Sequence, residues 1–177
     1  MKWSIKDVAK VSLVVAALSV GMLAGPSNVF AQDKSARLAQ EIQGSWVLVS
    51  IYNESDGKKT EPFGPSPRGS LILTPDGRFS MMFVRAGLPK FASNNRMKGT
   101  AAENEAVVQG SIAYFGGYSV ASGNEQAVTL HTEGSTFPNW DGQDQKRLMT
   151  VSGNEMKLIN QATAIGGTNY QVWKRVK

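Results

Sequence analysis

Cysteine is absent from this chain of 177 residues, and histidine occurs only once, at position 131. Without a thiol the chain can form no disulfide, and it can carry no lipid-modified cysteine behind an export signal. A zinc site would have to be built around the single imidazole. His131 and Glu133 offer two ligands on one strand, whereas zinc usually takes more nitrogen or sulfur. The sequence therefore predicts no metal site.

Three further features are missing. No segment reaches the ~20 consecutive apolar residues that a membrane-spanning helix needs. The glycines lie in hairpins or between tyrosines, not in the strand-to-helix turn that cradles phosphates. The 19 Lys and Arg residues are scattered over turns and strand ends and do not gather on one face, although the pI is about 9.5. We expect no organic cofactor, no nucleic-acid partner and no stable membrane anchor.

The N-terminal region is typical of an export signal. Three lysines stand within the first ten residues, residues 11–25 are apolar, and Val29-Phe30-Ala31 places small residues where a signal peptidase reads them. The sequence predicts a signal peptide over residues 1–31, cleavage before Gln32, and a periplasmic or secreted protein. An uncleaved anchor is the alternative. Residues 32–177 are then one domain with one core.

From residue 45 onward the apolar residues alternate with a period of two, which is typical of half-buried β-strands. Dipeptides such as Asp56-Gly57 and Gly153-Asn154 supply the positive φ that tight hairpins need, and short connections force antiparallel neighbours. The eight expected strands are 45–52, 69–74, 78–85, 111–122, 126–135, 145–152, 155–161 and 169–176.

Three segments are expected outside the strands. Residues 33–43 have the spacing of a short helix that leans on something larger, and Gly44 ends it. Thr100-Ala-Ala-Glu103 fits a capping box, so a second helix is expected from there to Gln109. The three prolines between residues 62 and 67 indicate a stiff, exposed loop or edge.

The stretch from residue 110 to residue 147 carries a resemblance to a known family. Ile112-Ala-Tyr-Phe-Gly-Gly-Tyr118 is followed by a strand with His131, by the loop Ser135-Thr-Phe-Pro-Asn-Trp140 and by a strand with Arg147. This order resembles the bacterial and fungal lipocalin-like domain family. The resemblance implies an all-β fold, an antiparallel up-and-down barrel of about eight strands with short flanking helices. A sheet of that size can close on itself, and a β-sandwich is the alternative.

Gly44-Ser-Trp46 is similar to the glycine-x-tryptophan signature of lipocalins in general. In that group an arginine of the last strand packs across the tryptophan at the closed end of the barrel. The resemblance implies this role for Arg175, through a cation–π contact worth ~0.5 to 2 kcal/mol. The alternative is that Trp46 is ordinary core and Arg175 a solvated terminus.

The strand from Tyr114 to Tyr118 suggests a binding surface. Tyr114, Gly116 and Tyr118 share one face, so two rings flank a position without a side chain, as in a barrel interior that makes room. Plain packing would give the same pattern. Met81 adds adaptable apolar surface, which suits a cavity or an irregular core equally well.

The loop and the strand that follow supply further candidates. Trp140 is a possible rim residue, because an exposed tryptophan is costly unless it packs on the barrel or meets a ligand. Arg147 matches the arginine strand of the family, and it either points inward to fix a carboxylate or is a surface charge. The predicted ligand-binding residues are Met81, Tyr114, Gly116, Tyr118, His131, Trp140 and Arg147.

Catalysis would depend on His131. His131, Glu133 and Ser135 alternate on one strand face, but side chains two apart lie ~6 to 7 Å from each other. The hydrogen bonds of a nucleophilic triad need ~3 Å. We therefore predict no catalytic residue and keep His131 as a weak candidate, which a bulge or a partner from another strand would strengthen.

The leading hypothesis is an exported lipocalin-like barrel that binds a small, largely apolar or amphipathic molecule without transforming it. One alternative is a cavity-type isomerase or cyclase that uses Tyr114, Tyr118, His131 or Arg147 as polar handles. Another is a structural envelope protein with a filled barrel. A cavity with His131 beside a tyrosine or an acid would favour the enzyme, and a barrel without a void would favour the structural protein.

Overall fold

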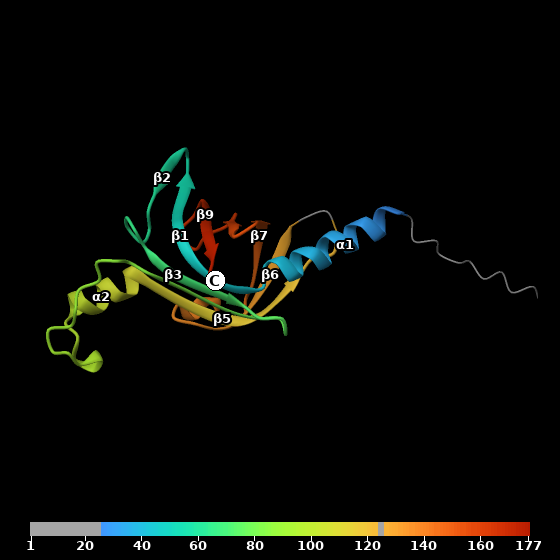
Figure 1. Ribbon diagram of the computed structural model, residues 1–177. Helices are drawn as coiled ribbons and strands as arrows, with labels where there is room; N and C mark the ends of the chain where they lie inside the picture. The colour runs from blue at the N-terminus through green and yellow to red at the C-terminus, as the bar shows by residue number, and fades with distance from the viewer. Residues whose placement is uncertain (1–25, 124–125) are drawn as a thin grey trace, which may run out of the picture.

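The computed structural model describes residues 26–123 and 126–177 (Figure 1). In this part of the chain one antiparallel sheet runs in the order β2-β1-β3-β4-β5-β6-β7-β8-β9, and β1 also pairs with β9. This last pairing closes eight strands into a barrel, which confirms the predicted fold. The strands are β1 (Gly44–Ser55), β2 (Lys58–Thr60), β3 (Arg68–Leu73), β4 (Arg78–Val84), β5 (Ser111–Val120), β6 (Ala127–Ser135), β7 (Asp144–Ser152), β8 (Glu155–Asn160) and β9 (Thr168–Arg175).

The eight predicted strands coincide with β1 and β3 to β9 to within two residues at most ends. The sequence missed β2, because Lys58-Lys59-Thr60 is exposed throughout and has no apolar alternation. This short strand pairs only with the far end of β1, in the register Asn53↔Thr60. It therefore lengthens a hairpin and is not part of the closed wall.

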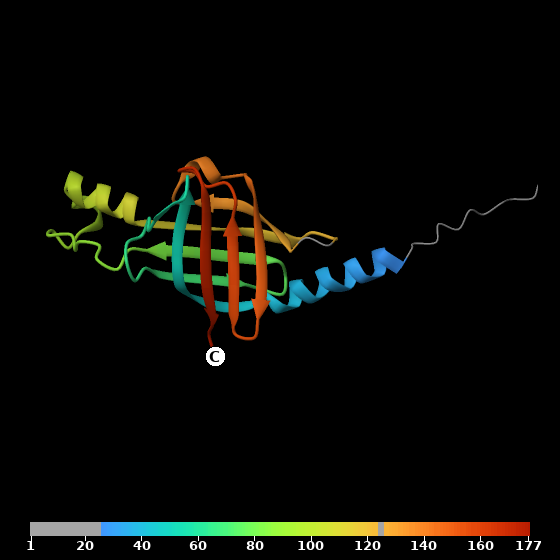
Figure 2. The ribbon, with the colours of Figure 1, turned by 90° about the horizontal axis from the view of Figure 1, so that it is seen from above.

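Two α-helices and two short 3-10 helices complete the described residues: α1 (Pro26–Glu41), α2 (Ala101–Gly110), η1 (Arg96–Lys98) and η2 (Pro138–Trp140). In Figure 2 α1 and α2 project from opposite sides of the barrel. None of the helices described is long and apolar enough to cross a membrane. The apolar part of the predicted signal peptide lies outside the described residues, and α1 runs through the predicted cleavage position.

The predicted capping box at the start of α2 is present. The Thr100 hydroxyl accepts from the Glu103 N–H at 3.2 Å, and the Glu103 carboxylate accepts from the Thr100 N–H at 2.8 Å. A further bond from the Ala92 N–H, at 2.8 Å, ties the preceding loop to this helix. These backbone donors hold the pKa of Glu103 below its usual range.

The end of the barrel beside α1 is closed, as the resemblance implied. Trp46 is fully buried and donates from Nε1 to the Ile42 carbonyl at 2.8 Å. The Arg175 guanidinium lies 4.1 Å from the centroid of its ring. The same guanidinium donates to the carbonyls of Glu41 and Gln43, so one side chain covers the tryptophan and satisfies the end of α1.

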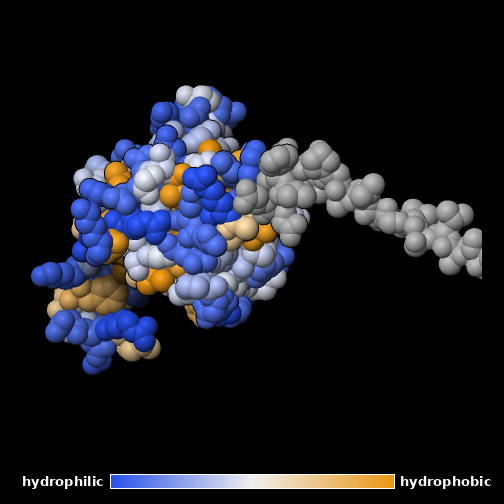
Figure 3. All heavy atoms as spheres, turned by 45° about the vertical axis from the view of Figure 1, so that its right-hand side comes forward, coloured by the Kyte–Doolittle hydropathy of each residue, from blue (hydrophilic) through white to orange (hydrophobic). Residues whose placement is uncertain are grey.

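The interior of the barrel is apolar toward this closed end, whereas toward the other end buried polar side chains lie among apolar ones. The fully buried residues of the closed half include Trp46, Leu71, Leu73, Val128, Leu130, Met156 and Leu158. On the outside, Figure 3 shows a mainly hydrophilic face in which apolar side chains are scattered. The part of the interior that could serve a polar function is therefore the half away from α1, which we call the open end.

Candidate functional site

All six buried polar or charged side chains of the described residues lie toward the open end: Asn53, Thr132, Arg147, Asn160, Asn169 and Gln171. They come from β1, β6, β7, β8 and β9, each within four residues of the strand end that faces away from α1. Buried polar groups are expensive unless they are hydrogen-bonded, so their concentration in one half is informative.

Arg147 is the charge at the centre of this set, with 4 % of its surface exposed. One terminal nitrogen donates to the Lys146 carbonyl at 2.8 Å and to Asn160 Oδ1 at 3.1 Å, and the other donates to Gln145. Its Nε–H is buried and has no hydrogen-bond partner in the described part of the chain. Within that part no carboxylate lies at ion-pair distance from it. The buried cation is thus solvated by neutral acceptors only.

Tyr114 lies beside Arg147 and connects it to Met81, Trp140 and Phe137. Tyr114 is buried and donates from its hydroxyl to Met81 Sδ at 2.9 Å. Trp140 of η2 packs edge-on against Tyr114, with ring centroids 5.1 Å apart, and Phe137 packs against Trp140 at 5.6 Å. Burial raises the pKa of Tyr114, and the neighbouring Arg147 offsets part of the rise. Met81, Tyr114, Trp140 and Arg147 are therefore brought together.

A second polar row follows β9 and β1 at the same end. Trp173 Nε1 donates to Gln171 at 3.0 Å, Gln171 donates to Asn169 at 2.7 Å, and Asn169 donates to Asn53 at 2.6 Å. These amides are not among the ligand-binding residues predicted from the sequence. Asn169 and Gln171 alternate in phase with Trp173, so the period of two already placed them on the interior face.

Gly116 lies on the interior face between Tyr114 and Tyr118, but it makes no room for a ligand. A Cβ at this position would stand 1.9 Å from the His131 carbonyl oxygen and 2.9 Å from the Glu133 nitrogen. The register of β5 and β6 shifts here, so that Glu133 bulges out of the ladder and the main chain of β6 occupies the space. Only glycine fits at position 116, because the main chain of β6 leaves no space for a Cβ.

Tyr118 is separate from this group, because it lies near the closed end. Its hydroxyl donates to the Thr74 carbonyl at 2.8 Å. It also lines a hollow of about 350 Å³ between α1 and the turn from β3 to β4, outside the barrel. A second hollow, of about 310 Å³, lies on another side of α1.

His131 does not face the interior. Its side chain is 45 % exposed on the outer wall, between the inward-facing Leu130 and Thr132. Its Nδ1 lies 2.7 Å from Asp144 Oδ1, and its Nε2 lies 3.0 Å from Ser119 Oγ. The cavity arrangement expected of an isomerase or cyclase, with the histidine beside an interior tyrosine, is therefore not formed.

A comparison with known protein families agrees with this architecture. Residues 43–176 match the family model described as the lipocalin-like domain. A crystal structure of a mutant of the fluorescent protein UnaG is similar with a TM-score of 0.37 and 12% identity, over 78% of this chain and 98% of that chain. A search of curated proteins gave no significant match.

Proposed function

Because the chain belongs to the lipocalin-like domain family, we propose that it binds a small, largely apolar molecule at the open end of its barrel, with an anionic group of that molecule on Arg147. The observation that carries the proposal is the buried guanidinium, which has neutral partners and an Nε–H without an acceptor. The other buried polar side chains of the open end, together with the rings of Trp140 and Phe137, would surround the bound molecule.

The charge of Arg147 gives the reason for an anionic group. Taking a guanidinium out of water costs several kcal/mol unless an opposite charge or a full set of acceptors compensates it. An arginine offers a planar fork of donors that matches a carboxylate or sulfonate with two parallel hydrogen bonds. A ligand oxygen on Nε would satisfy the one buried side-chain donor that the described residues leave without a partner.

The rings beside Arg147 give the reason for an apolar body. Trp140 and Phe137 belong to the connection between β6 and β7, so they can move apart without breaking a strand ladder. Tyr114 and Met81 form the floor beneath them. We propose that the molecule enters past η2 and packs between these side chains.

Two matched fluorescent probes test this binding. Anilinonaphthalene sulfonate carries an anion, and N-phenyl-naphthylamine has the same rings without it. Arg147→Met should weaken binding of the sulfonate about 10- to 100-fold, which corresponds to the ~1.5 to 3 kcal/mol of a charged hydrogen bond. Binding of the neutral probe should change by less than about threefold. Fluorescence titration of the unchanged protein and of Arg147→Met measures the dissociation constant of each protein for each probe.

His131→Ala is the matched control for the same titration. The histidine lies on the outer wall, so its removal should leave the affinity for either probe within about threefold. If Arg147→Met weakens both probes equally, the anionic contact is refuted. If neither probe binds the unchanged protein, the structural hypothesis gains support, because the closed half of the barrel is already filled by buried apolar side chains.

We propose in addition that the protein is exported and begins at Gln32, on the composition of residues 1–31. Intact mass of the protein secreted by its own cell would show a species that starts at Gln32. A species that retains residues 11–25 would contradict export by signal cleavage.

A further inference from the structure

Ser119, His131 and Asp144 meet on the outer wall of the barrel, across three neighbouring strands. His131 of β6 stands opposite Asp144 of β7 and Gly117 of β5. Ser119 lies two residues beyond Gly117, opposite Thr129. Directly opposite and diagonal neighbours on a sheet are close enough to interact. The distances are 2.7 Å from Asp144 Oδ1 to His131 Nδ1, and 3.0 Å from His131 Nε2 to Ser119 Oγ.

The carboxylate fixes which ring nitrogen carries the proton. An ionised Asp144 can only accept, so the hydrogen of the neutral imidazole resides on Nδ1. Nε2 then presents its lone pair to the hydroxyl of Ser119. This is the order of contacts in a nucleophilic triad, in which the acid orients the base and the base activates the hydroxyl.

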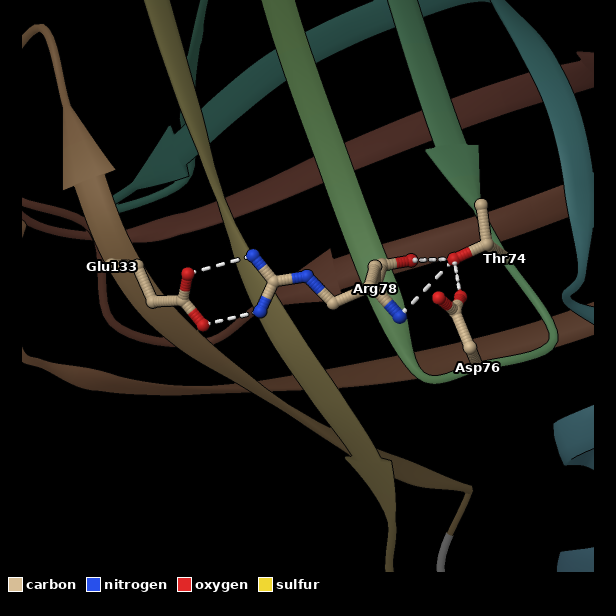
Figure 4. A network of polar contacts seen from close by, with 4 residues as sticks. All are labelled: Thr74, Asp76, Arg78 and Glu133. Atoms are coloured by element: carbon tan, nitrogen blue, oxygen red, sulfur yellow. Dashed lines mark hydrogen bonds and ion pairs between the residues drawn. The ribbon is translucent and has the colours of Figure 1, made fainter.

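A neighbouring ion pair keeps the other carboxylate of this face away from the histidine. Arg78 reaches across β5 and binds Glu133 through both terminal nitrogens, as Figure 4 shows. Arg78 is in register with Gly117 of the intervening strand. The Arg78 hydrogen bonds hold the pKa of Glu133 below its usual range, and in the described part of the chain the carboxylate on His131 is that of Asp144.

Ser119 also lies at the edge of a hollow. The space of about 350 Å³ between α1 and the β3–β4 turn is lined by Ser119, by apolar groups such as those of Ala36, Ala39 and Pro75, and by the polar residues Ser35 and Gln43. A small apolar acyl group fits such a surface. The hydroxyl, its base and a place for a substrate therefore lie next to one another.

We propose that Ser119, His131 and Asp144 form an acyl-transfer site for small esters, separate from the barrel interior. Ser119 Oγ attacks the carbonyl carbon and its proton passes to His131 Nε2. The bond to the leaving oxygen then breaks, and His131 returns the proton to that oxygen. Water attacks the acyl-serine in the same way, so that ester and water become acid and alcohol.

The position of Ser119 inside a strand sets the expected substrate range. Its main chain lies in the β5–β6 ladder, whereas strong esterases place the nucleophile on a turn beside N–H groups aimed at the developing oxyanion. We therefore expect turnover of esters with good leaving groups, such as nitrophenyl acetate, and slow turnover of alkyl esters.

Nitrophenyl acetate and a sulfonyl fluoride test the site in the whole chain. Mixing with nitrophenyl acetate should release a burst of nitrophenolate equal to the protein present, and the sulfonyl fluoride should add one group on Ser119, located by peptide mass spectrometry. Ser119→Ala should reduce the burst rate by roughly 100-fold or more, within the range of positioned proton transfer. Ser80→Ala, an exposed serine of β4, is the matched control and should change nothing.

The base and the acid are tested by non-additivity. His131→Ala and Asp144→Asn should each slow acylation. Adding His131→Ala to Ser119→Ala should not lower the acylation rate further, because the three groups act as a unit. Circular dichroism checks that these exposed changes leave the fold intact. The chain has one histidine, so a full rate in Ser119→Ala would show that the imidazole reacts alone and would overturn the proposal. Absence of any burst above that of Ser119→Ala would overturn it as well.

Discussion

Replacing Trp46 by Ala is expected to lower the free energy of unfolding by about 3 to 5 kcal/mol, the cost of deleting a buried aromatic ring. The ring is fully buried, its Nε1–H is bonded to the Ile42 carbonyl, and Arg175 covers its face at 4.1 Å. Alanine leaves a cavity at the closed end. It also leaves the Ile42 carbonyl without its hydrogen-bond donor and removes the ring that the Arg175 guanidinium packs against. Three stabilising contacts are thus lost by one change.

Chemical denaturation followed by circular dichroism measures this effect. The adjacent residue offers a control, because Val47 points outward and is 46% exposed. Val47→Ala should change the free energy of unfolding by no more than about 0.5 kcal/mol. A loss well below 1 kcal/mol for Trp46→Ala would show that this tryptophan does not hold the closed end together.

Among the described glycines, Gly116→Ala is expected to be the most destabilising substitution by alanine. The added Cβ would stand 1.9 Å from the His131 carbonyl oxygen, and the obstacle is main chain that no rotamer change can move. We expect a loss of at least ~3 kcal/mol, at the upper end for overpacking, or failure to fold. The β6 bulge at Glu133 would have to be rebuilt to relieve the contact.

Gly117→Ala is the matched control, since it adds the same methyl group one residue further along β5. There the nearest atom, the Gly77 carbonyl oxygen, would lie 3.7 Å away, which is ordinary contact. Thermal and chemical unfolding of the two variants should therefore differ clearly, with Gly117→Ala close to the unchanged protein. Equal stability of the two variants would contradict the β5–β6 contact.

The sequence by itself determined the features that depend on near neighbours in the chain. The period of two placed eight strands, the turn dipeptides made them antiparallel, and Thr100 with Glu103 formed the predicted capping box. The strand phase also placed Arg147 on a face shared with Met149, although it could not say that this face was the interior. Such features are local because backbone dihedrals, side-chain alternation and capping bonds act over a few residues.

The tertiary structure alone decided which side chains come into contact and whether a buried charge such as that of Arg147 has an oppositely charged partner. Along β6, His131 and Ser135 are too far apart for a triad, yet the registers of β5 and β7 bring Ser119 and Asp144 to the same imidazole. Within residues 26–123 and 126–177 no acid pairs with Arg147, and this likewise depends on the strands around it. Closure of β1 on β9 and the bulge at Glu133 join residues far apart in sequence. Pairing register is set by the packing of the whole sheet, so no local pattern contains it.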